Sequence, residues 1–189
     1  MSTAPFDRRP HHLPYGQRRG KRGRGPGRAE DRPVDGKAHK KAVKQALRSR
    51  RIPRARLQYG ALCWRRRKGK LRVLLVTSRS TRRWIIPKGW PIRTLGPRGT
   101  ALREAFEEAG VAEGSVGPAL GFYSYRKVIS RSKSITCLVQ VFAVEVTDTS
   151  KSYPEVSQRT RRWHKPKKAA RLVSEPELRG LIRQLPTQV

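Results

Sequence analysis

Beyond residue 56, the apolar residues of the chain fall into strand-sized runs that are rich in β-branched side chains. Residues 57–66 (LQYGALCWRR) and 70–79 (KLRVLLVTSR) are two such runs, and the polar segment RRKGK between them predicts a β-hairpin. Residues 82–91 (RRWIIPKGWP) predict a further short strand. Pro87 and Gly89 end it, because proline lacks the N–H group that a strand ladder needs.

In the segment PRGTALREAFEEAG, residues 97–110, the apolar residues no longer recur at every second position but at every third or fourth. Pro97 suits the first turn of a helix, and Gly110 suits the position after its last turn. The spacing predicts one apolar helix face, made of Ala101, Leu102, Ala105, Phe106 and Ala109.

Two long strands are predicted next, over residues 119–129 and 134–146, joined by the basic turn SRSK. A loop over 148–161 and a short strand at RRWHKP lead into two predicted helices, at 166–173 and 175–185. The order of strands, helix, strands and helices predicts a mixed α/β domain over residues 57–189.

Residues 1–56 differ in composition, with 18 Lys and Arg against four acidic residues and few large aliphatic side chains. The run GQRRGKRGRGPGR cannot bury enough apolar surface to offset the entropy of ordering, which predicts a disordered basic tail. Residues 35–51 are expected to become a short helix only against a polyanion. The tail is interpreted either as a tether for RNA or polyphosphate or as a solubilising segment without a specific partner.

The whole chain carries 45 Lys and Arg against 13 Asp and Glu, a formal charge of +32. Such a surface attracts polyanions without choosing among them. Cys63 and Cys137 lie in apolar runs and are expected to be buried free thiols in a reducing compartment. No apolar run is long enough to span a bilayer, and the N-terminus has no secretory h-region, so a cytoplasmic location is predicted.

Three of the 13 acidic residues, Glu104, Glu107 and Glu108, fall within five positions of the predicted helix. The i, i+3 and i+4 spacing places them on one helix face, where carboxylates repel one another unless a cation neutralises them. A solvated acidic stripe is the common explanation of such a run. It fits poorly in a chain that otherwise avoids acids. Carboxylate-rich oxygen sites suit Mg²⁺, with Mn²⁺ as an alternative, and metal-assisted attack of water on a phosphoanhydride is the chemistry indicated.

The segment GWPIRTLGPRGTALREAFEEAGV, residues 89–111, resembles the Nudix box, G-x5-E-x7-R-E-U-x-E-E-x-G-U, where U is aliphatic. The positions in register are Gly89, Arg103, Glu104, Glu107, Glu108, Gly110 and Val111. With its flanks, residues 57–186 resemble the bacterial branch related to diphosphoinositol polyphosphate phosphohydrolases. The resemblance implies a Nudix α/β/α sandwich around a mixed β-sheet and a hydrolase of phosphoric anhydrides.

By this resemblance, Glu104, Glu107 and Glu108 are metal ligands, and the carbonyl of Gly89 completes the coordination. Glu108 is the first choice for activating water, with Glu107 second. Arg103 is expected to be structural. The box expects Glu where this chain has Leu95, so Arg103 needs another partner; Ala105 replaces an aliphatic residue and reduces a packing contact.

A polyphosphate substrate also needs cations opposite the metal helix. The candidates are Arg83, Lys88, Arg126, Lys127 and Lys133, with Arg82 and Arg131 beside them. The sequence favours a Mg²⁺-dependent pyrophosphohydrolase of a diphosphoinositol or dinucleoside polyphosphate. Two alternatives stay open: hydrolysis of RNA 5′ ends or caps, and a Nudix-fold module that binds RNA or polyphosphate without turnover.

Overall fold

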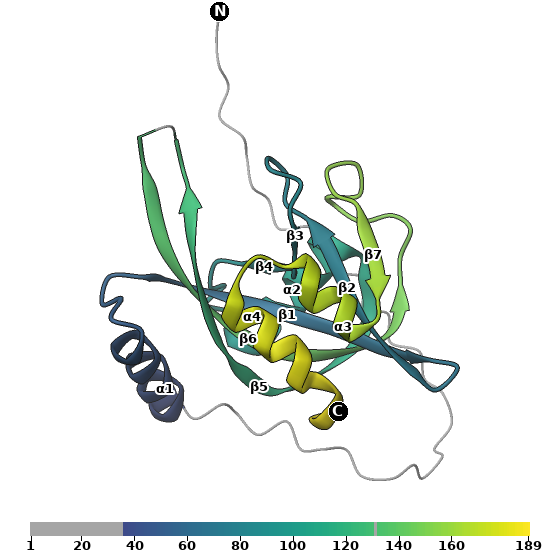
Figure 1. Ribbon diagram of the computed structural model, residues 1–189, viewed down its shortest axis with the longest axis horizontal. Coiled ribbons are helices and arrows are strands. Elements are labelled where there is room, and N and C mark those ends of the chain that lie inside the picture. The colour runs from purple at the N-terminus through teal and green to yellow at the C-terminus, as the bar shows by residue number, and fades with distance from the viewer. Residues whose placement is uncertain (1–35, 131) are drawn as a thin grey trace, which may run out of the picture. The chain divides into compact units, whose positions relative to one another are not determined.

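In the computed structural model, residues 36–130 and 132–189 are described, and they fold around one mixed β-sheet (Figure 1). The strands are β1 (Arg56–Arg67), β2 (Lys70–Thr77), β3 (Trp84–Ile85), β4 (Lys88–Gly89), β5 (Val111–Val128), β6 (Ser134–Thr149) and β7 (Arg161–His164). The helices are α1 (Gly36–Ser49), α2 (Gly96–Ala109), α3 (Pro166–Leu172) and α4 (Pro176–Gln184), followed by a 3₁₀ turn, η1 (Leu185–Thr187).

The strands lie in the order β3-β2-β1-β6-β5, with β4 paired to β1 and β7 paired to β2. The β1–β6 pair is parallel and the other strand pairs are antiparallel, so the sheet is mixed. The predicted hairpin is confirmed as β1–β2. Its turn places Lys68 and Gly69 at φ of 49° and 70°, the left-handed pair that suits the twist of a tight hairpin.

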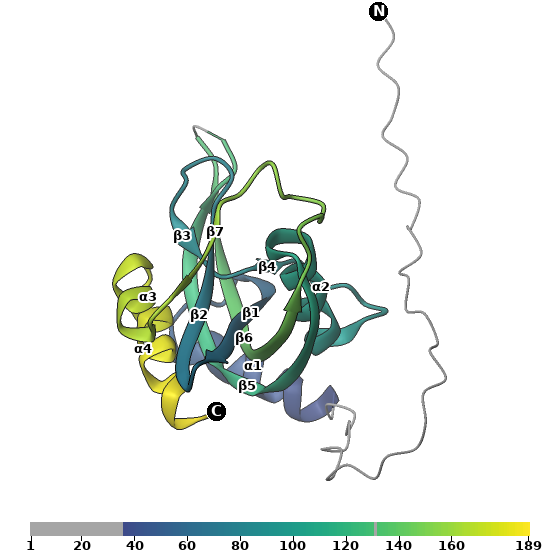
Figure 2. The same ribbon diagram turned by 90° about the vertical axis from the view of Figure 1, so that its right-hand side faces the viewer.

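Helices cover both faces of the sheet, which confirms the predicted sandwich: α2 on one face, α3 and α4 on the other (Figure 2). Side chains alternate along β1, so Ala61 faces the α2 layer and Leu62 faces the α3–α4 layer. Cys63 and Cys137 are buried free thiols, as predicted.

Helix α2 begins and ends close to the positions that the sequence predicts. Pro97 lies in its first turn, and Gly110 adopts the left-handed conformation (φ 64°), with its N–H donating to the carbonyls of Ala105 and Phe106. Ala105 is fully buried against the sheet. The Arg161 guanidinium donates a hydrogen bond of 2.6 Å to the carbonyl of Ala109 at this end.

Helix α1 departs from the prediction that residues 1–56 are a disordered tail, which is wrong for the segment from Gly36 onward. Ala46 is buried, and His39 Nε2 lies 3.0 Å from the Tyr59 hydroxyl. Arg50 donates to Glu177 (2.6 Å) and to the carbonyl of Phe122 (2.9 Å). These partners are distant in sequence, so composition alone cannot predict them. The predicted disorder of residues 1–35 lies outside the described residues.

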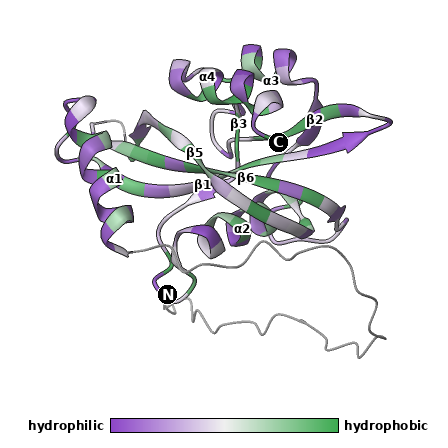
Figure 3. Ribbon diagram, turned by 90° about the horizontal axis from the view of Figure 1, so that it is seen from below, coloured by the Kyte–Doolittle hydropathy of each residue, from purple (hydrophilic) through white to green (hydrophobic). Residues whose placement is uncertain are grey.

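None of the helices described is long and apolar enough to cross a membrane. Figure 3 shows the hydrophobic residues concentrated in the strands between the helical layers, while α1 carries both hydrophilic and hydrophobic residues.

Candidate active site

Glu104 lies against Gly89, the residue that follows Lys88 in the two-residue strand β4. A Cβ atom at position 89 would overlap the Glu104 carboxylate, so any residue other than glycine requires this carboxylate to move. The register of β4 on β1, with Tyr59 opposite Gly89 and Gly60 opposite Lys88, sets this approach. The structure therefore brings together two of the residues that the box predicts to act on one metal ion.

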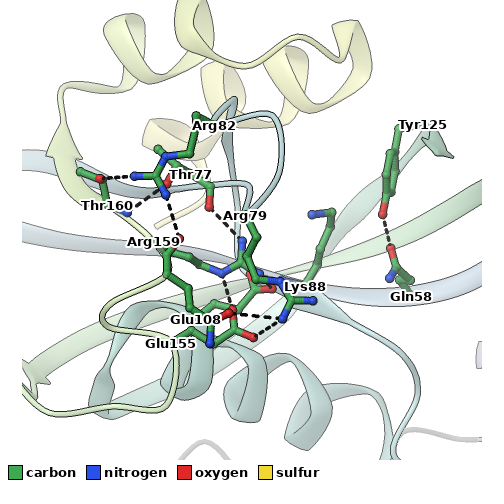
Figure 4. A network of polar contacts seen from close by, with 11 residues as sticks. Gln58, Thr77, Arg79, Arg82, Lys88, Glu108, Tyr125, Glu155, Arg159 and Thr160 are labelled. Carbon is green, nitrogen blue, oxygen red and sulfur yellow. Dashed lines mark hydrogen bonds and ion pairs between the residues drawn. The ribbon is translucent and has the colours of Figure 1, made fainter. Parts of the chain in front are cut away.

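Glu108 is buried, with 6% of its surface exposed, and it accepts hydrogen bonds from two directions. The backbone N–H of Lys88 donates to Oε2 at 3.2 Å, and the guanidinium of Arg159 pairs with Oε1 (Figure 4). The same guanidinium pairs with Glu155 and donates to the carbonyl of Thr77 at 2.9 Å. Arg159 thus connects α2 to the end of β2 and to the loop before β7.

Glu107 has a different cationic partner. Its carboxylate pairs with Arg103, one helical turn earlier on α2. Leu95, at the position where the box expects Glu, is 42% exposed at the start of α2. Arg103, which lacks the usual box glutamate at position 95, therefore pairs with Glu107 of α2 instead.

Burial and like charges shift the titration of these carboxyl groups. The pKa of Glu104 is raised from 4.5 to about 7, first by burial and then by Glu108, Glu107 and Glu155. Burial also raises the pKa of Glu108, against the opposing effects of Lys88 and Arg159. Lys88 is half-buried, and burial lowers its pKa. At Glu104, burial and the neighbouring carboxylates thus outweigh the opposing effect of Lys88.

Among residues 36–130 and 132–189, no three Asp, Glu, His or Cys side chains stand close enough together to hold a metal ion. Arg103 and Arg159 hold the carboxylates of Glu107 and Glu108 instead. Glu104 has no hydrogen-bonded or ion-paired partner among the described residues. An all-oxygen set with one uncompensated, glycine-cradled carboxylate fits a hard divalent cation such as Mg²⁺.

Next to the carboxylates, cations and aromatic rings gather around β4. The ammonium of Lys88 lies 5.3 Å from the Tyr125 ring centre. The Trp90 ring is contacted by the guanidinium of Arg56 at 4.5 Å and the ammonium of Lys127 at 4.7 Å. The hydroxyl of Tyr125 donates to Gln58 at 2.8 Å (Figure 4). Lys88 links the glutamates of α2 to these aromatic rings, since its backbone contacts Glu108 and its side chain contacts Tyr125.

The other predicted substrate cations are not brought to this place. Arg83 pairs with Glu175 at 3.4 Å, and Arg126 donates to Ser134. Lys133 closes the β5–β6 turn, where its carbonyl accepts from the N–H of Ile129 at 2.8 Å. Arg131 lies outside the described residues. Lys88 lies close to Glu108, and Lys127 is near enough to Lys88 to lower its pKa.

Glu155 and Arg159 were missed by the sequence reasoning. Glu155 carried a weak signal, because acids are rare in this chain and it stands alone in the predicted loop 148–161 apart from Asp148. Arg159 carried none, being one of 45 basic residues. Gln58, a buried polar residue inside an apolar strand, was a further unused signal.

The protein-family model described as "NUDIX domain" matches residues 56–185. The chain belongs to the Nudix family. Mouse (Mus musculus) diphosphoinositol polyphosphate phosphohydrolase 3-alpha is 32% identical to this Nudix chain over 106 residues, 55% of this chain and 60% of the mouse protein. Nudix hydrolase 4 of Arabidopsis thaliana is 34% identical over 93 residues, 49% of this chain and 43% of the plant protein. The Nudix chain thus spans about half the length of the curated relatives that it matches.

Solved structures share the Nudix fold at low sequence identity. A binary complex of the C. elegans Ap4A hydrolase has a TM-score of 0.54 and 18% identity, covering 70% of this chain and 96% of the worm protein. The E. coli dihydroneopterin triphosphate pyrophosphohydrolase has a TM-score of 0.54 and 13% identity, with the same coverage. At these identities the likeness shows the fold alone.

Proposed function

We propose that this Nudix protein is a Mg²⁺-dependent pyrophosphohydrolase that cleaves a phosphoanhydride bond in a densely phosphorylated small molecule. The observation that carries the proposal is the half-buried Glu104 carboxylate, which lies against Gly89 and has Glu107, Glu108 and Glu155 as neighbours. Glu107, Glu108 and Glu155 form ion pairs with arginines, whereas Glu104 forms none with a described residue and has only the nearby Lys88 ammonium to offset its charge. A divalent cation and a phosphate group supply complementary charges to these two parts of the site.

The residues proposed to hold the cation are Glu107 and Glu108, together with the Gly89 carbonyl, and Glu104 lies beside them against Gly89. When bound, Mg²⁺ supplies polarisation of phosphoryl oxygens and acidification of a water molecule. In the reaction, the water oxygen forms a bond to phosphorus as the bridging P–O bond breaks, and the leaving phosphate keeps the bonding electrons. A carboxylate takes the proton from water.

The sequence prediction gave that proton-accepting role to Glu108 and then to Glu107. Both side chains have cationic partners here, Arg159 and Arg103, which lower the basicity of a carboxylate. Glu104 forms no ion pair with a described residue, and its pKa of about 7, which Lys88 lowers only in part, is close to the value that suits a general base at neutral pH. We therefore place proton acceptance at Glu104 and keep Glu107 and Glu108 as ligands in the proposal.

Substrate recognition is proposed to use the cations and rings around β4: Lys88, Lys127, Arg56, Trp90 and Tyr125. Three positive charges within one face of the sheet favour a substrate with several phosphates over one with a single phosphate. Relatives named for diphosphoinositol polyphosphates, and a structural neighbour named for Ap4A, support two candidate classes. Of these, diphosphoinositol polyphosphate needs only cations, whereas a dinucleoside polyphosphate also uses the aromatic rings.

The test is a phosphate-release assay with and without MgCl₂ on a diphosphoinositol polyphosphate, Ap4A and triphosphorylated RNA. We expect turnover of one of the first two, loss of it with EDTA, and its removal in Glu108→Gln and Glu104→Gln while the proteins stay folded. Turnover unchanged in Glu108→Gln overturns the metal-helix mechanism. Preference for the RNA moves the assignment to 5′-end hydrolysis, and folded protein without turnover of any substrate supports a binding module.

A further inference from the structure

Helix α1 has two different faces. Lys40, Lys41, Lys44 and Arg48 are exposed and follow the i, i+1, i+4, i+8 spacing, which places them on one side of a helix. The opposite side carries His39, which contacts Tyr59, and the buried Ala46. We call the four exposed cations the α1 basic face.

The α1 basic face is presented on a fixed support. The His39–Tyr59 contact holds the first half of the helix to β1, and the Arg50 contacts with Glu177 and with the carbonyl of Phe122 hold its end to α4 and β5. The helix backbone is thus ordered before any ligand arrives, which reduces the entropy lost on binding.

The four positive charges of the α1 basic face repel one another. Lys40 with Lys44, and Lys44 with Arg48, are like-charged pairs at i, i+4, a spacing that destabilises a helix. No acidic residue occurs between Gly36 and Arg56 to offset them. None of the four forms an ion pair within residues 36–130 and 132–189. A solvated helix face usually mixes both signs of charge, so four cations without a neighbouring acid favour a polyanionic partner.

We infer that the α1 basic face binds the phosphate backbone of a nucleic acid. The docking of α1 favours this partner over a membrane surface. A helix that binds lipid inserts its apolar side into the bilayer, but the less polar side of α1 is already occupied by the domain. The exposed side of α1 carries these four cations and no large apolar side chain, which matches the sequence-independent recognition of phosphates.

The test measures binding of a labelled oligouridine to the full chain between about 50 and 200 mM salt, where each phosphate contact contributes roughly 0.7 to the slope of log K against log salt. The α1 variant is Lys40→Gln, Lys41→Gln, Lys44→Gln and Arg48→Gln; glutamine keeps the helix propensity. The matched control removes four exposed cations around α3 instead: Lys165→Gln, Lys167→Gln, Lys168→Gln and Arg171→Gln.

We expect the salt slope to fall by about 3 in the α1 variant and by less than about 1 in the control, with affinity at low salt reduced about tenfold or more only in the α1 variant. Equal losses in the two variants overturn the proposal, because they mean that only net charge matters. Unchanged RNA binding with lost binding to phosphatidylserine vesicles also overturns it. Small-molecule turnover is a separate readout that the α1 variant should keep.

Discussion

The guanidinium of Arg159 and the carboxylate of Glu108 form an ion pair in which the two side chains are 6% and 8% exposed. An Arg159→Met substitution leaves the Glu108 charge buried and unpaired. We expect it to lower the free energy of unfolding of the Mg²⁺-free protein by about 3–5 kcal/mol, in urea denaturation at neutral pH.

Arg79 provides the control for that measurement, because it pairs with Glu155 at 3.5 Å from a side chain that is 62% exposed. Arg79→Met should cost less than about 1 kcal/mol. Added MgCl₂ should restore more stability to Arg159→Met than to Arg79→Met, since the cation replaces the missing charge. Equal effects of the two substitutions would show that the buried pair has no special role.

Gly89→Ala tests the close approach of β4 to Glu104. A methyl group there must displace the carboxylate, because the two would overlap. We expect a loss of about 1–3 kcal/mol in stability from overpacking, and a fall in turnover on the order of a hundredfold from the misplaced carboxylate.

Gly180→Ala is its counterpart, in the middle of α4, where a Cβ meets nothing within 4 Å. It should raise stability by about 0.5–1 kcal/mol and leave turnover unchanged. If both substitutions leave turnover intact, Glu104 does not need the place it occupies against β4.

The pH dependence of stability should report the raised pKa of Glu104. Its pKa is 4.5 when unfolded and about 7 when folded, so the folded state holds this proton more tightly. The contribution is therefore present below about pH 4.5 and is lost as pH rises through 7. In thermal unfolding with EDTA, the free energy of unfolding of Glu104→Gln minus that of the native protein should rise by up to about 3 kcal/mol from acid to alkaline pH.

Bound Mg²⁺ should abolish that difference by stabilising the ionised carboxylate. Leu95→Gln, which adds a neutral amide at an exposed position of the box, is a suitable control and should show no such pH-dependent gain. A pH-independent effect of Glu104→Gln would place this carboxyl in an ordinary, solvated environment.

Substrate binding should distinguish two neighbouring cations of β5. Lys127 contacts Trp90, whereas Arg126 points to the other face of the strand and donates to Ser134. Lys127→Gln should raise KM for a polyphosphorylated substrate about tenfold with little change in kcat, because a charged contact contributes about 1.5–3 kcal/mol. Arg126→Gln should leave KM near its native value, and the reverse order would place the substrate on the opposite face.

Helix α2 could be predicted from the sequence because its signals are local: a proline in the first turn, a glycine after the last, and a 3.6-residue period between them. The β1–β2 hairpin was predictable for the same reason. The docking of α1 was not, since Arg50 meets Glu177 across 127 positions of the chain. Composition reports the charge of such a segment and nothing of its distant partners.

The site shows the same division. The three glutamates follow from helical spacing, but their individual partners depend on the loop before β7, where Arg159 meets Glu108 across 51 positions. Spacing on a helix predicts a shared face and cannot tell which carboxylate is paired and which is left alone. That distinction moved the proposed base from Glu108 to Glu104.

The C-terminal end of α2 is held by the left-handed Gly110 and by the Arg161 hydrogen bond to Ala109. A side chain at position 110 would collide with Tyr153 and Arg161, so this end is not free to turn about the helix axis. Each residue advances a helix by about 100°. One residue inserted between Glu108 and Gly110 would therefore swing Glu104 and Glu108 away from β4 together. The segment between Glu108 and Gly110 should therefore tolerate substitutions better than insertions or deletions.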